Sequence, residues 1–368
     1  MAKDGSVVVV GGGIVGAAVA YSLAREGVPV HLVERGEVGR QASWAAGGVL
    51  TPVHLAEYPG PLAALCVASV PMFAPLVAEL GTRSSIDVEL RTTGMLYLVR
   101  DEEDASAAAT LESWKRQNGQ PVERLTGDDA RRRVPFLAPD VREALFISDV
   151  QQVRNHRLTR AFVEAAESHG AVVDRNREVT GFLRVPGRVN GVKTSRGDLK
   201  AETTVVAAGA WAAELLAQIG VVIPVMPVRG QMLLLEGPRD AIRHVVLSHD
   251  QYLIPRADGK VLLGSTVEEV GFDCRVTAEG AEFLLRRLRE MAPGARSFTL
   301  AGSWAGLRPG SPDRLPHLGR PDGITGLIVA CSHYRNGILL APITGRIVAD
   351  LIAGRAPGVD LTPFRLGR

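Results

Sequence analysis

The chain has 368 residues, a length that predicts two domains rather than a single core. Hydrophobic residues make up 46% and charged residues 22%, which is typical of a soluble globular protein, and the formal net charge is only +2. The densest basic spot, RRR at 131–133, is too small for a nucleic-acid-binding face. We therefore expect a small-molecule partner and no nucleic acid.

Cysteine usage and the apolar stretches favour a cytoplasmic protein. Cys66, Cys274 and Cys331 lie far apart in the chain, so they predict free thiols and no metal site. The first residues, MAKDGSVVVVGGG, lack the pattern of a signal peptide. The longest later apolar stretch, 63–80, contains two prolines and a glutamate, and it predicts helices packed on a core rather than a transmembrane segment.

The chain begins with a βαβ pattern. Residues 6–10 are mostly valine without alternation, which predicts a buried strand. Residues 14–27 predict a helix, and residues 29–34 predict a second strand. A strand, helix and strand in this order indicate a parallel sheet covered by helices.

The rest of the chain alternates between helical and strand-rich segments. In chain order we predict helices over 51–80, a strand at 94–100, helices at 102–119 and 156–169, short strands through 171–211 and 223–270, a helix at 277–291, a strand at 326–331 and a helix at 337–352. Nucleotide-domain patterns recur in separated segments. We predict a discontinuous cofactor domain of 1–84, 150–222 and 304–368, and a substrate domain of 85–149 and 223–303.

A dinucleotide fingerprint follows the first strand. Gly11, Gly13 and Gly16 form G-x-G-x-x-G, in which the first glycine permits a tight turn, the second admits a pyrophosphate and the third lets helix and strand pack closely. Glu34 ends the second strand, where an acidic side chain binds the adenosine ribose. Together these features predict an ADP-containing cofactor, and Glu34 disfavours NADP.

The fingerprint alone does not distinguish NAD from FAD. The run GRQASWAAGGVLTP, at 39–52, contains many small residues just after the acidic strand. Small side chains suit a close approach of the backbone to an extended cofactor, although a flexible loop is the alternative interpretation of this run.

Six motifs carry a resemblance to a known family. They are GGGIVG, VERG, GRQASWAAGGVL, VVAAGAW, WAGLRPGSPDRLPHLG and HYRNGILLAPITG. Together they resemble the FAD-dependent amino-acid oxidases of the D-amino acid oxidase, glycine oxidase and sarcosine oxidase family, and within it the glycine oxidases of the thiamine pathway. The motifs run from residue 11 to about 350, nearly the whole chain.

The resemblance implies an α/β fold with a GR2-type, Rossmann-like FAD-binding domain and a substrate domain on a mixed, largely antiparallel sheet. It implies noncovalent FAD, because the cysteine that tethers FAD in sarcosine oxidases has no counterpart at 303–313. With the fingerprint, the residues expected to contact FAD are Gly11, Gly13, Ile14, Val15, Gly16, Glu34, Arg35, Ala42, Ser43, Gly47, Gly48, Val49, Val179, His333, Tyr334, Arg335, Asn336, Gly337, Ile338 and Leu339.

Arg308 is the main candidate for substrate binding. It lies in the apolar sequence WAGLRPG, where an unpaired guanidinium is costly to bury. The residues alone leave two partners equally open, a substrate carboxylate or a structural ion pair, and the resemblance favours the carboxylate. The resemblance also places Tyr252 and Arg335 in this pocket. Without it, Tyr252 reads as a half-buried strand residue, and Arg335 could instead guard the entrance.

The predicted helix at 337–352 leads to a hypothesis about the flavin. Helix N-termini stabilise negative charge, so N–H groups near 336–339 would stabilise the reduced flavin anion. The resemblance implies hydride transfer from the substrate α-carbon to FAD, with no certain acid or base among the side chains. Oxygen would be reduced to hydrogen peroxide, and the product iminoglycine would supply thiazole synthesis for thiamine.

Departures from the relatives leave the preferred substrate open among glycine, sarcosine, other N-alkyl glycines and D-amino acids. Val49 and Val267 stand where relatives often carry methionine, and Asp250 replaces a histidine found in some. A dehydrogenase of the same family with a quinone acceptor is the nearest alternative. An NAD-dependent dehydrogenase and a flavin-binding protein without turnover are alternatives of other classes. Relatives also suggest a homo-oligomer, such as a tetramer, and transfer of the imine to thiazole synthase.

Overall fold

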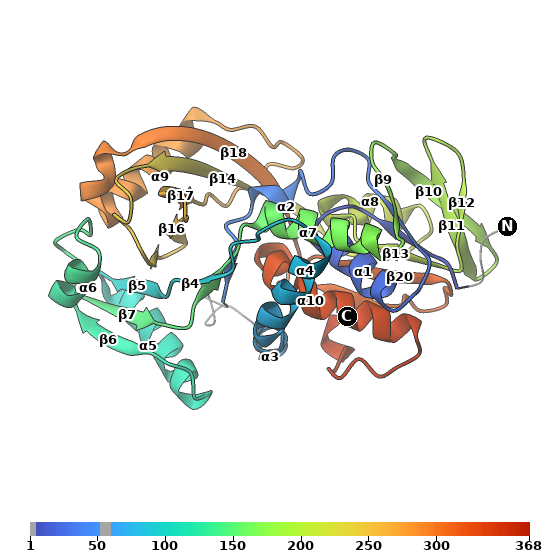
Figure 1. Ribbon diagram of the computed structural model, residues 1–368, viewed down its shortest axis with the longest axis horizontal. Coiled ribbons are helices and arrows are strands. Elements are labelled where there is room, and N and C mark those ends of the chain that lie inside the picture. The colour runs from blue at the N-terminus through green and yellow to red at the C-terminus, as the bar shows by residue number, and fades with distance from the viewer. Residues whose placement is uncertain (1–4, 52–59) are drawn as a thin grey trace.

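A computed structural model describes residues 5–51 and 60–368. Figure 1 shows two lobes side by side along the longest axis, one on a mainly parallel sheet and the other on a larger, mainly antiparallel sheet. This arrangement confirms the predicted α/β class with a mixed sheet. Of the helical region predicted at 51–80, residues 52–59 lie outside the described part of the chain. The predicted domain boundaries remain a prediction.

The first sheet gathers strands from three separate parts of the chain. Its order is β19 (His317–Gly319), β20 (Leu327–Cys331), β13 (Thr203–Val206), β1 (Val7–Val10), β2 (Val30–Val33) and β9 (Val172–Asp174). All neighbours pair in parallel except β19 with β20. All four residues of β1 are buried, because the sheet is covered on both faces. The predicted βαβ start is confirmed.

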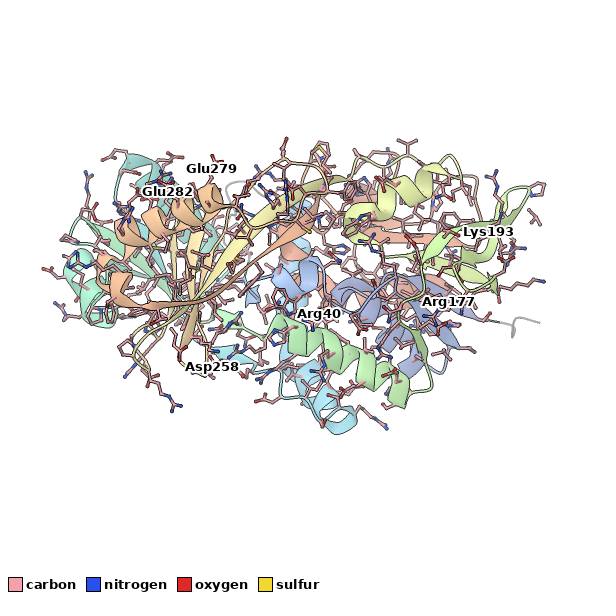
Figure 2. All side chains as sticks on the ribbon, turned by 90° about the horizontal axis from the view of Figure 1, so that it is seen from above. Arg40, Arg177, Lys193, Asp258, Glu279 and Glu282 are labelled. Carbon is pink, nitrogen blue, oxygen red and sulfur yellow. The ribbon has the colours of Figure 1, made fainter. Side chains whose placement is uncertain are left out.

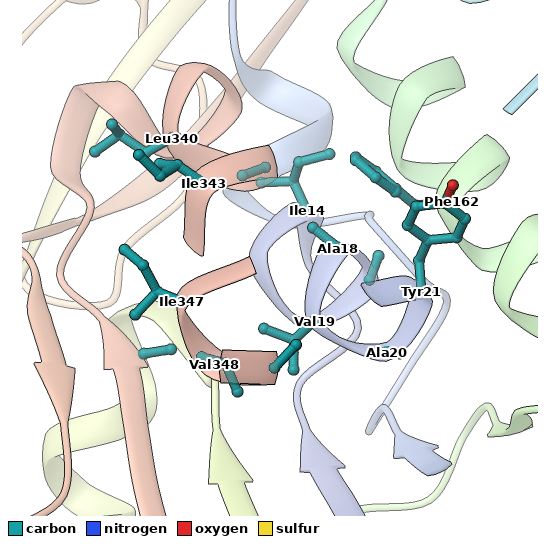
Figure 3. Close-up of a cluster of buried hydrophobic side chains, with 14 of the residues drawn as sticks. Ile14, Ala18, Val19, Ala20, Tyr21, Phe162, Leu340, Ile343, Ile347 and Val348 are labelled. Atoms are coloured by element: carbon teal, nitrogen blue, oxygen red, sulfur yellow. The ribbon is translucent and has the colours of Figure 1, made fainter. Parts of the chain in front are cut away.

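Helix α1 (Ile14–Arg25) packs against α10 (Gly337–Ile352) and α7 (Asn155–Ser168) in the centre of this lobe. Figure 3 shows Val19 of α1 facing α10, and Tyr21 of α1 facing Phe162 of α7, with ring centroids 5.6 Å apart. A Cβ at Gly345 of α10 would lie only 2.7 Å from the Ala18 carbonyl oxygen. The glycine therefore lets the two helix backbones approach closely.

The helical stretch Gly60–Arg83 is long and apolar enough to cross a membrane by length and composition alone. It consists of α3 (Gly60–Ser69), a 3-10 turn η2 (Val70–Met72) and α4 (Phe73–Arg83). The Ser69 hydroxyl donates to the Leu339 carbonyl oxygen of α10 (2.6 Å), and Phe73 is buried in the same cluster as α1. These contacts pack one face of the stretch on the lobe, and 33% of its most apolar window is buried.

The second sheet has the order β18 (Thr299–Gly310), β14 (Met226–Glu236), β17 (Lys260–Gly264), β16 (Gln251–Pro255), β15 (Val245–Ser248), β5 (Met95–Val99), β7 (Glu143–Ile147) and β6 (Glu123–Thr126). Only β15 and β5 pair in parallel among these described strands. Its helices are α5 (Glu102–Gln117), α6 (Gly127–Arg133) and α9 (Ala278–Met291). In Figure 2, Glu279 and Glu282 lie on α9 at one end of the molecule, and Lys193 lies at the other.

Smaller elements complete the lobes. They are α2 (Ala42–Ala45), α8 (Ala212–Ala217), a 3-10 turn η3 (Gly209–Trp211), a sheet of β10 (Val179–Val185), β11 (Arg188–Thr194) and β12 (Leu199–Lys200), and a sheet of β3 (Val49–Leu50), β8 (Gln151–Gln152) and β4 (Arg91–Thr92). The strands β18, β7 and β6 and the helix α6 were not predicted. The β18 sequence TLAGSWAGLRPG contains three glycines, which have no side chain and interrupt the pattern of residues typical of a strand.

Replacing Gly345 by alanine should destabilise the protein, because the new Cβ would lie 2.5 Å from Ser22 Oγ as well as near the Ala18 carbonyl oxygen. We expect a loss of about 1–3 kcal/mol in the free energy of unfolding, measured by urea unfolding. Gly81→Ala in α4 is the matched control. No atom lies within 4 Å of the Cβ position there, so alanine should stabilise by up to about 1 kcal/mol. Equal stabilities of the two variants would contradict the close helix approach.

Candidate functional site

A cavity of about 750 Å³ lies between the two sheets. On one side it meets the carboxyl ends of the parallel strands, where open α/β sheets bind their ligands. On the other side it reaches β14, β16 and β18. The residues that mark these walls are Gly11, Glu34, Ala207, Ser332, Gly230, Tyr252 and Arg308.

The glycine fingerprint forms the turn between β1 and α1. Gly11 has a φ of +105°, and a Cβ there would lie 2.6 Å from the Ala207 carbonyl oxygen. A Cβ at Gly16 would lie 1.9 Å from the Gly11 carbonyl oxygen, so Gly16 serves the packing of helix on turn and does not line the cavity. Gly13 is the N-cap of α1 and provides no side-chain cap. The N-terminal N–H groups of α1 at the cavity fit a pyrophosphate.

Glu34 lies at the end of β2 and lines the cavity. Its two carboxylate oxygens accept hydrogen bonds from the backbone N–H groups of Gly12 (2.7 Å) and Gly36 (3.0 Å). Each oxygen retains a second lone pair for a ribose hydroxyl. The two backbone bonds thus orient the carboxylate, and its contact with the cofactor ribose remains a prediction.

The small residues after Glu34 make a thin wall of the cavity. Ser43 Oγ in α2 accepts a hydrogen bond from the Ile14 N–H (2.8 Å), so it occupies one of the first free donors of α1. Gly48 has a φ of +75°, and a Cβ there would lie 2.3 Å from the Val153 carbonyl oxygen. A Cβ at Gly47 would lie 2.6 Å from Ile254 Cδ1. Small residues are therefore required in this segment for packing as well as for access to the cavity.

Arg35, predicted as a cofactor contact, also lines the cavity and stacks on Trp211. Its guanidinium carbon lies 3.8 Å from the ring centroid, and Phe272 stacks on Trp211 with a centroid distance of 5.5 Å. The stack joins the end of β2 to η3 and to the loop after β17. A cation over an aromatic ring is attracted by the ring quadrupole, so the stack fixes the position of Arg35.

The segment from Ser332 to Ile338 forms another wall, and Leu339 lies behind it in the core. Helix α10 begins at Gly337, as predicted, with no side-chain cap. His333 is buried, and its Nε2 lies 3.0 Å from the Thr344 hydroxyl. Burial lowers the pKa of His333 to about 3, so its ring is neutral at physiological pH. This wall therefore offers backbone dipoles rather than a charged imidazole.

Cys331 also lines the cavity, at the end of β20. Burial raises the pKa of this thiol to about 12, so it is protonated and unreactive. The proposal of a noncovalent cofactor agrees with an inert thiol at this position.

Arg308 lies near the end of β18 and faces the cavity from the second sheet. Its Nη2 donates to Ser265 Oγ (2.6 Å) and its Nη1 to the Thr266 carbonyl oxygen (3.2 Å). Among the described residues no carboxylate forms an ion pair with it, and burial lowers its pKa. Of the two partners left open by the sequence, a structural ion pair is absent from the described chain. A bidentate carboxylate would complement this guanidinium.

Tyr252 and Arg335 line the same end of the cavity as Arg308. The Tyr252 hydroxyl has Met232 Sδ as a weak acceptor at 3.6 Å. Arg335 Nη1 donates to Asp250 Oδ1 at 2.8 Å. Asp250 itself and Val267, which the sequence associated with the substrate pocket, are not among the lining residues.

Most predicted site residues converge on the cavity, and Gly16 and Leu339 are the members that do not line it. Sequence reasoning missed part of the lining, namely Ala207–Trp211, Glu214, Leu215 and Gln218 after β13, and Met95, Gly230, Val245, Leu247, Ile254 and Ser265 of the second sheet. The VVAAGAW motif at 205–211 signals Ala207–Trp211, because it continues directly from a buried parallel strand, whereas Glu214, Leu215 and Gln218 lie beyond it. The second group has no local sequence signal.

The glycine turn, the oriented Glu34 and the N-termini of α1 and α10 at the cavity fit a dinucleotide that carries a redox ring. The family described as FAD dependent oxidoreductase (DAO) matches residues 6–351, so the chain belongs to this family and its cofactor is FAD. This finding excludes the NAD-dependent alternative.

Individual relatives agree with the family. A glycine oxidase from Pseudomonas aeruginosa is 39% identical over 97% of both chains. The crystal structure of glycine oxidase from Geobacillus kaustophilus has a TM-score of 0.94 at 36% identity, over 98% of both chains. The bifunctional protein ThiO/ThiG from Synechocystis is 33% identical, over 96% of this chain and 52% of its own length.

The lowered pKa values of three histidines predict how the free energy of unfolding changes at acidic pH. Burial, as the largest cause, lowers the pKa of His156 and His317 to about 4 and that of His333 to about 3. The unfolded value is about 6.5, so the unfolded state binds more protons between these limits. The stability that neutral histidines contribute is therefore complete above about pH 6.5 and is lost as the pH falls toward 4.

His333→Asn should reduce this slope. Between pH 4.5 and 6, the pH dependence of the unfolding free energy should fall by up to one proton, or about 1.4 kcal/mol per pH unit. Urea unfolding with saturating FAD measures it. Thr344→Val removes the hydrogen-bond partner but keeps the imidazole, so its slope should match that of the wild type. A slope that His333→Asn leaves unchanged would refute the neutral buried histidine.

Proposed function

We propose that this FAD-dependent oxidoreductase is an amino-acid oxidase of the glycine oxidase type, acting on glycine and related small amines such as sarcosine and D-amino acids. The observation that carries the proposal is Arg308, a guanidinium that faces the cavity with neutral acceptors and no described carboxylate partner. It complements one carboxylate of a small substrate. The names of the relatives support glycine as a substrate.

The cofactor half of the cavity would hold FAD through backbone groups. The turn at Gly11 and Gly13 would receive the pyrophosphate, and Glu34 would bind the ribose. The chemistry that FAD would supply when bound is acceptance of a hydride from the substrate α-carbon and transfer of the electrons to oxygen, which would give an imine and hydrogen peroxide. The N-terminus of α10, at Gly337, would stabilise the negative charge that the ring system gains on reduction.

The substrate half would position the amino acid. Ser265 and Thr266 hold the Arg308 guanidinium in place, and Arg308 would clamp the carboxylate. The Tyr252 hydroxyl would turn from its weak sulfur acceptor to the same carboxylate. Tyr252 and Arg335, which share this end with Arg308, are neither carboxylates nor imidazoles, so the substrate amine would enter in its neutral form. Positioning, rather than acid–base chemistry, is then the contribution of the protein.

The fate of the product is also proposed from the resemblance. The imine would be hydrolysed or handed to thiazole synthase for thiamine synthesis, and the ThiO/ThiG name of one relative supports this link. We further propose a cytoplasmic homo-oligomer.

Anaerobic flavin reduction tests the function. Glycine, sarcosine, D-alanine and D-proline are added in turn to the yellow holoprotein without oxygen, and the flavin band near 450 nm is followed. We expect at least one of them to bleach the band and the ranking of the rates to name the preferred substrate. A band that none of them bleaches would refute the proposal. Reoxidation by oxygen compared with an artificial quinone distinguishes an oxidase from a dehydrogenase.

Arg308→Met should lower kcat/KM for glycine by about 10²- to 10³-fold, because it removes one partner of a buried, hydrogen-bonded charge pair. Arg308→Lys keeps the charge but loses the two-pronged geometry, so its loss should be smaller. Peroxide formation measures both variants, and the visible spectrum verifies that each retains FAD. A change of less than threefold in Arg308→Met would show that the carboxylate binds elsewhere.

A further inference from the structure

A second arginine lies in the substrate half of the cavity, and it has a carboxylate partner. Arg335 Nη1 donates to Asp250 Oδ1 at 2.8 Å, and the Arg335 side chain is only 14% exposed. Arg335 belongs to the 3-10 turn η5 (Tyr334–Asn336) of the cofactor lobe. Asp250 lies in the two-residue turn between β15 and β16 of the other sheet. The ion pair therefore joins the two lobes beside the cavity.

The turn that carries Asp250 is anchored on its other side. His249 has a φ of +49°, and its ring nitrogens lie 3.4 Å from Asp104 Oδ1 and 3.8 Å from Asp101 Oδ2, at the start of α5. The next strand, β16, begins with Gln251 and continues with Tyr252, which lines the cavity. Asp250 is thus fixed at a defined position next to the substrate half.

Both members of the pair act on Arg308. The pKa of Arg308 is lowered, chiefly by burial; the positive charge of Arg335 also lowers it, and the Asp250 carboxylate opposes the effect. Arg308 and Arg335 together would attract two carboxylates if neither had a partner. Asp250 already satisfies one of them and adds a negative charge beside the other.

We propose that Asp250 determines charge specificity: by pairing with Arg335 it restricts the pocket to substrates with one carboxylate and discriminates against amino acids and amines that carry a second one. The inference rests on the proposed function and names its substrate class. A second carboxylate would have to displace Asp250 from Arg335 and would then lie beside a like charge. Such a repulsive element is how a site rejects a competing ligand.

The test compares Asp250→Asn with two controls. Asn has nearly the same shape and tolerates the same turn, but it removes the charge. Asp250→Glu keeps the charge. Asp140→Asn removes an equal charge from a surface pair with Arg100, where the Asp140 side chain is 58% exposed.

The readout is the rate of anaerobic flavin reduction by glycine and sarcosine against that by iminodiacetate and D-aspartate. In Asp250→Asn the ratio of dicarboxylate to monocarboxylate rate constants should rise about 10-fold or more, the factor that corresponds to about 1.4 kcal/mol. In Asp250→Glu and Asp140→Asn the ratio should stay within about twofold of the wild type, a change that corresponds to less than about 0.5 kcal/mol. An unchanged ratio in Asp250→Asn would overturn the inference while leaving the proposed function intact.

A binding measurement separates the two claims. Acetate and malonate are titrated into the holoprotein, and their dissociation constants are read from the flavin absorbance. If no amine reduces the flavin, the proposed function fails, and the ratio of acetate to malonate affinities in Asp250→Asn still decides the charge inference. If Asp250→Asn fails to fold, Asp250→Ser replaces it. A wild-type protein that binds malonate more than tenfold tighter than acetate would refute the inference without any variant.

Discussion

The guanidinium of Arg308 is the constraint on which the substrate half of this molecule depends. An arginine cannot lose its charge, and a buried charge without a carboxylate is costly, so the surrounding chain must supply acceptors and space. Ser265 and Thr266 supply the acceptors. Gly230 supplies the space, because a Cβ there would lie 2.2 Å from Arg308 Nη2. Since Val228 faces Arg308 in the β14–β18 register, Gly230 is the diagonal neighbour on the same face.

A second buried arginine holds the two halves of the cavity together. Arg256, just after β16, donates from Nη2 to the Gly47 carbonyl oxygen (2.7 Å) and from Nη1 to Gln152 Oε1 (2.9 Å) and the Val153 carbonyl oxygen (3.1 Å). Burial lowers its pKa to about 9, which still leaves it charged at neutral pH. The loop at Gly47, which lines the cavity, is thereby tied to the strand that carries Tyr252. Neither lobe can shift far without breaking these bonds.

Local sequence patterns explain why the nucleotide site and several helices could be predicted. The valines of β1, the glycines after it and Glu34 all act within one βαβ unit, so their spacing alone indicates a nucleotide site. Helix α7 has a clear amphipathic pattern, α1 directly follows the glycine turn, and α10 begins at the residue that the sequence predicted. The resemblance added Arg308, whose motif WAGLRPG is specific, and it also placed Tyr252, which lies outside the six motifs.

Contacts between distant segments could not be predicted. Strand β18 was not predicted because its three glycines lower the strand propensity of the segment. The parallel pairing of β15 with β5 joins segments about 150 residues apart and has no turn signal. The sequence around Arg256 and Ser265 carries no local signal of their contacts. Their roles depend on partners that only the folded chain brings near.

The two halves of the cavity differ in how they are built, and this difference bears on how specificity arises. The cofactor half is made chiefly of backbone donors and small residues. Several of these tolerate little change, because an added Cβ would meet backbone at Gly11 and Gly48 and a side chain at Gly47. The substrate half contains the charged side chains of Arg308 and Arg335 among mostly apolar neighbours. Asp250, the partner of Arg335, lies beside it in a two-residue turn, and its side chain is 42% exposed. Such a turn accepts other residues at little cost in packing. The chemistry is therefore fixed by the rigid half, whereas the choice among small amino acids is open to change through a few side chains at the rim.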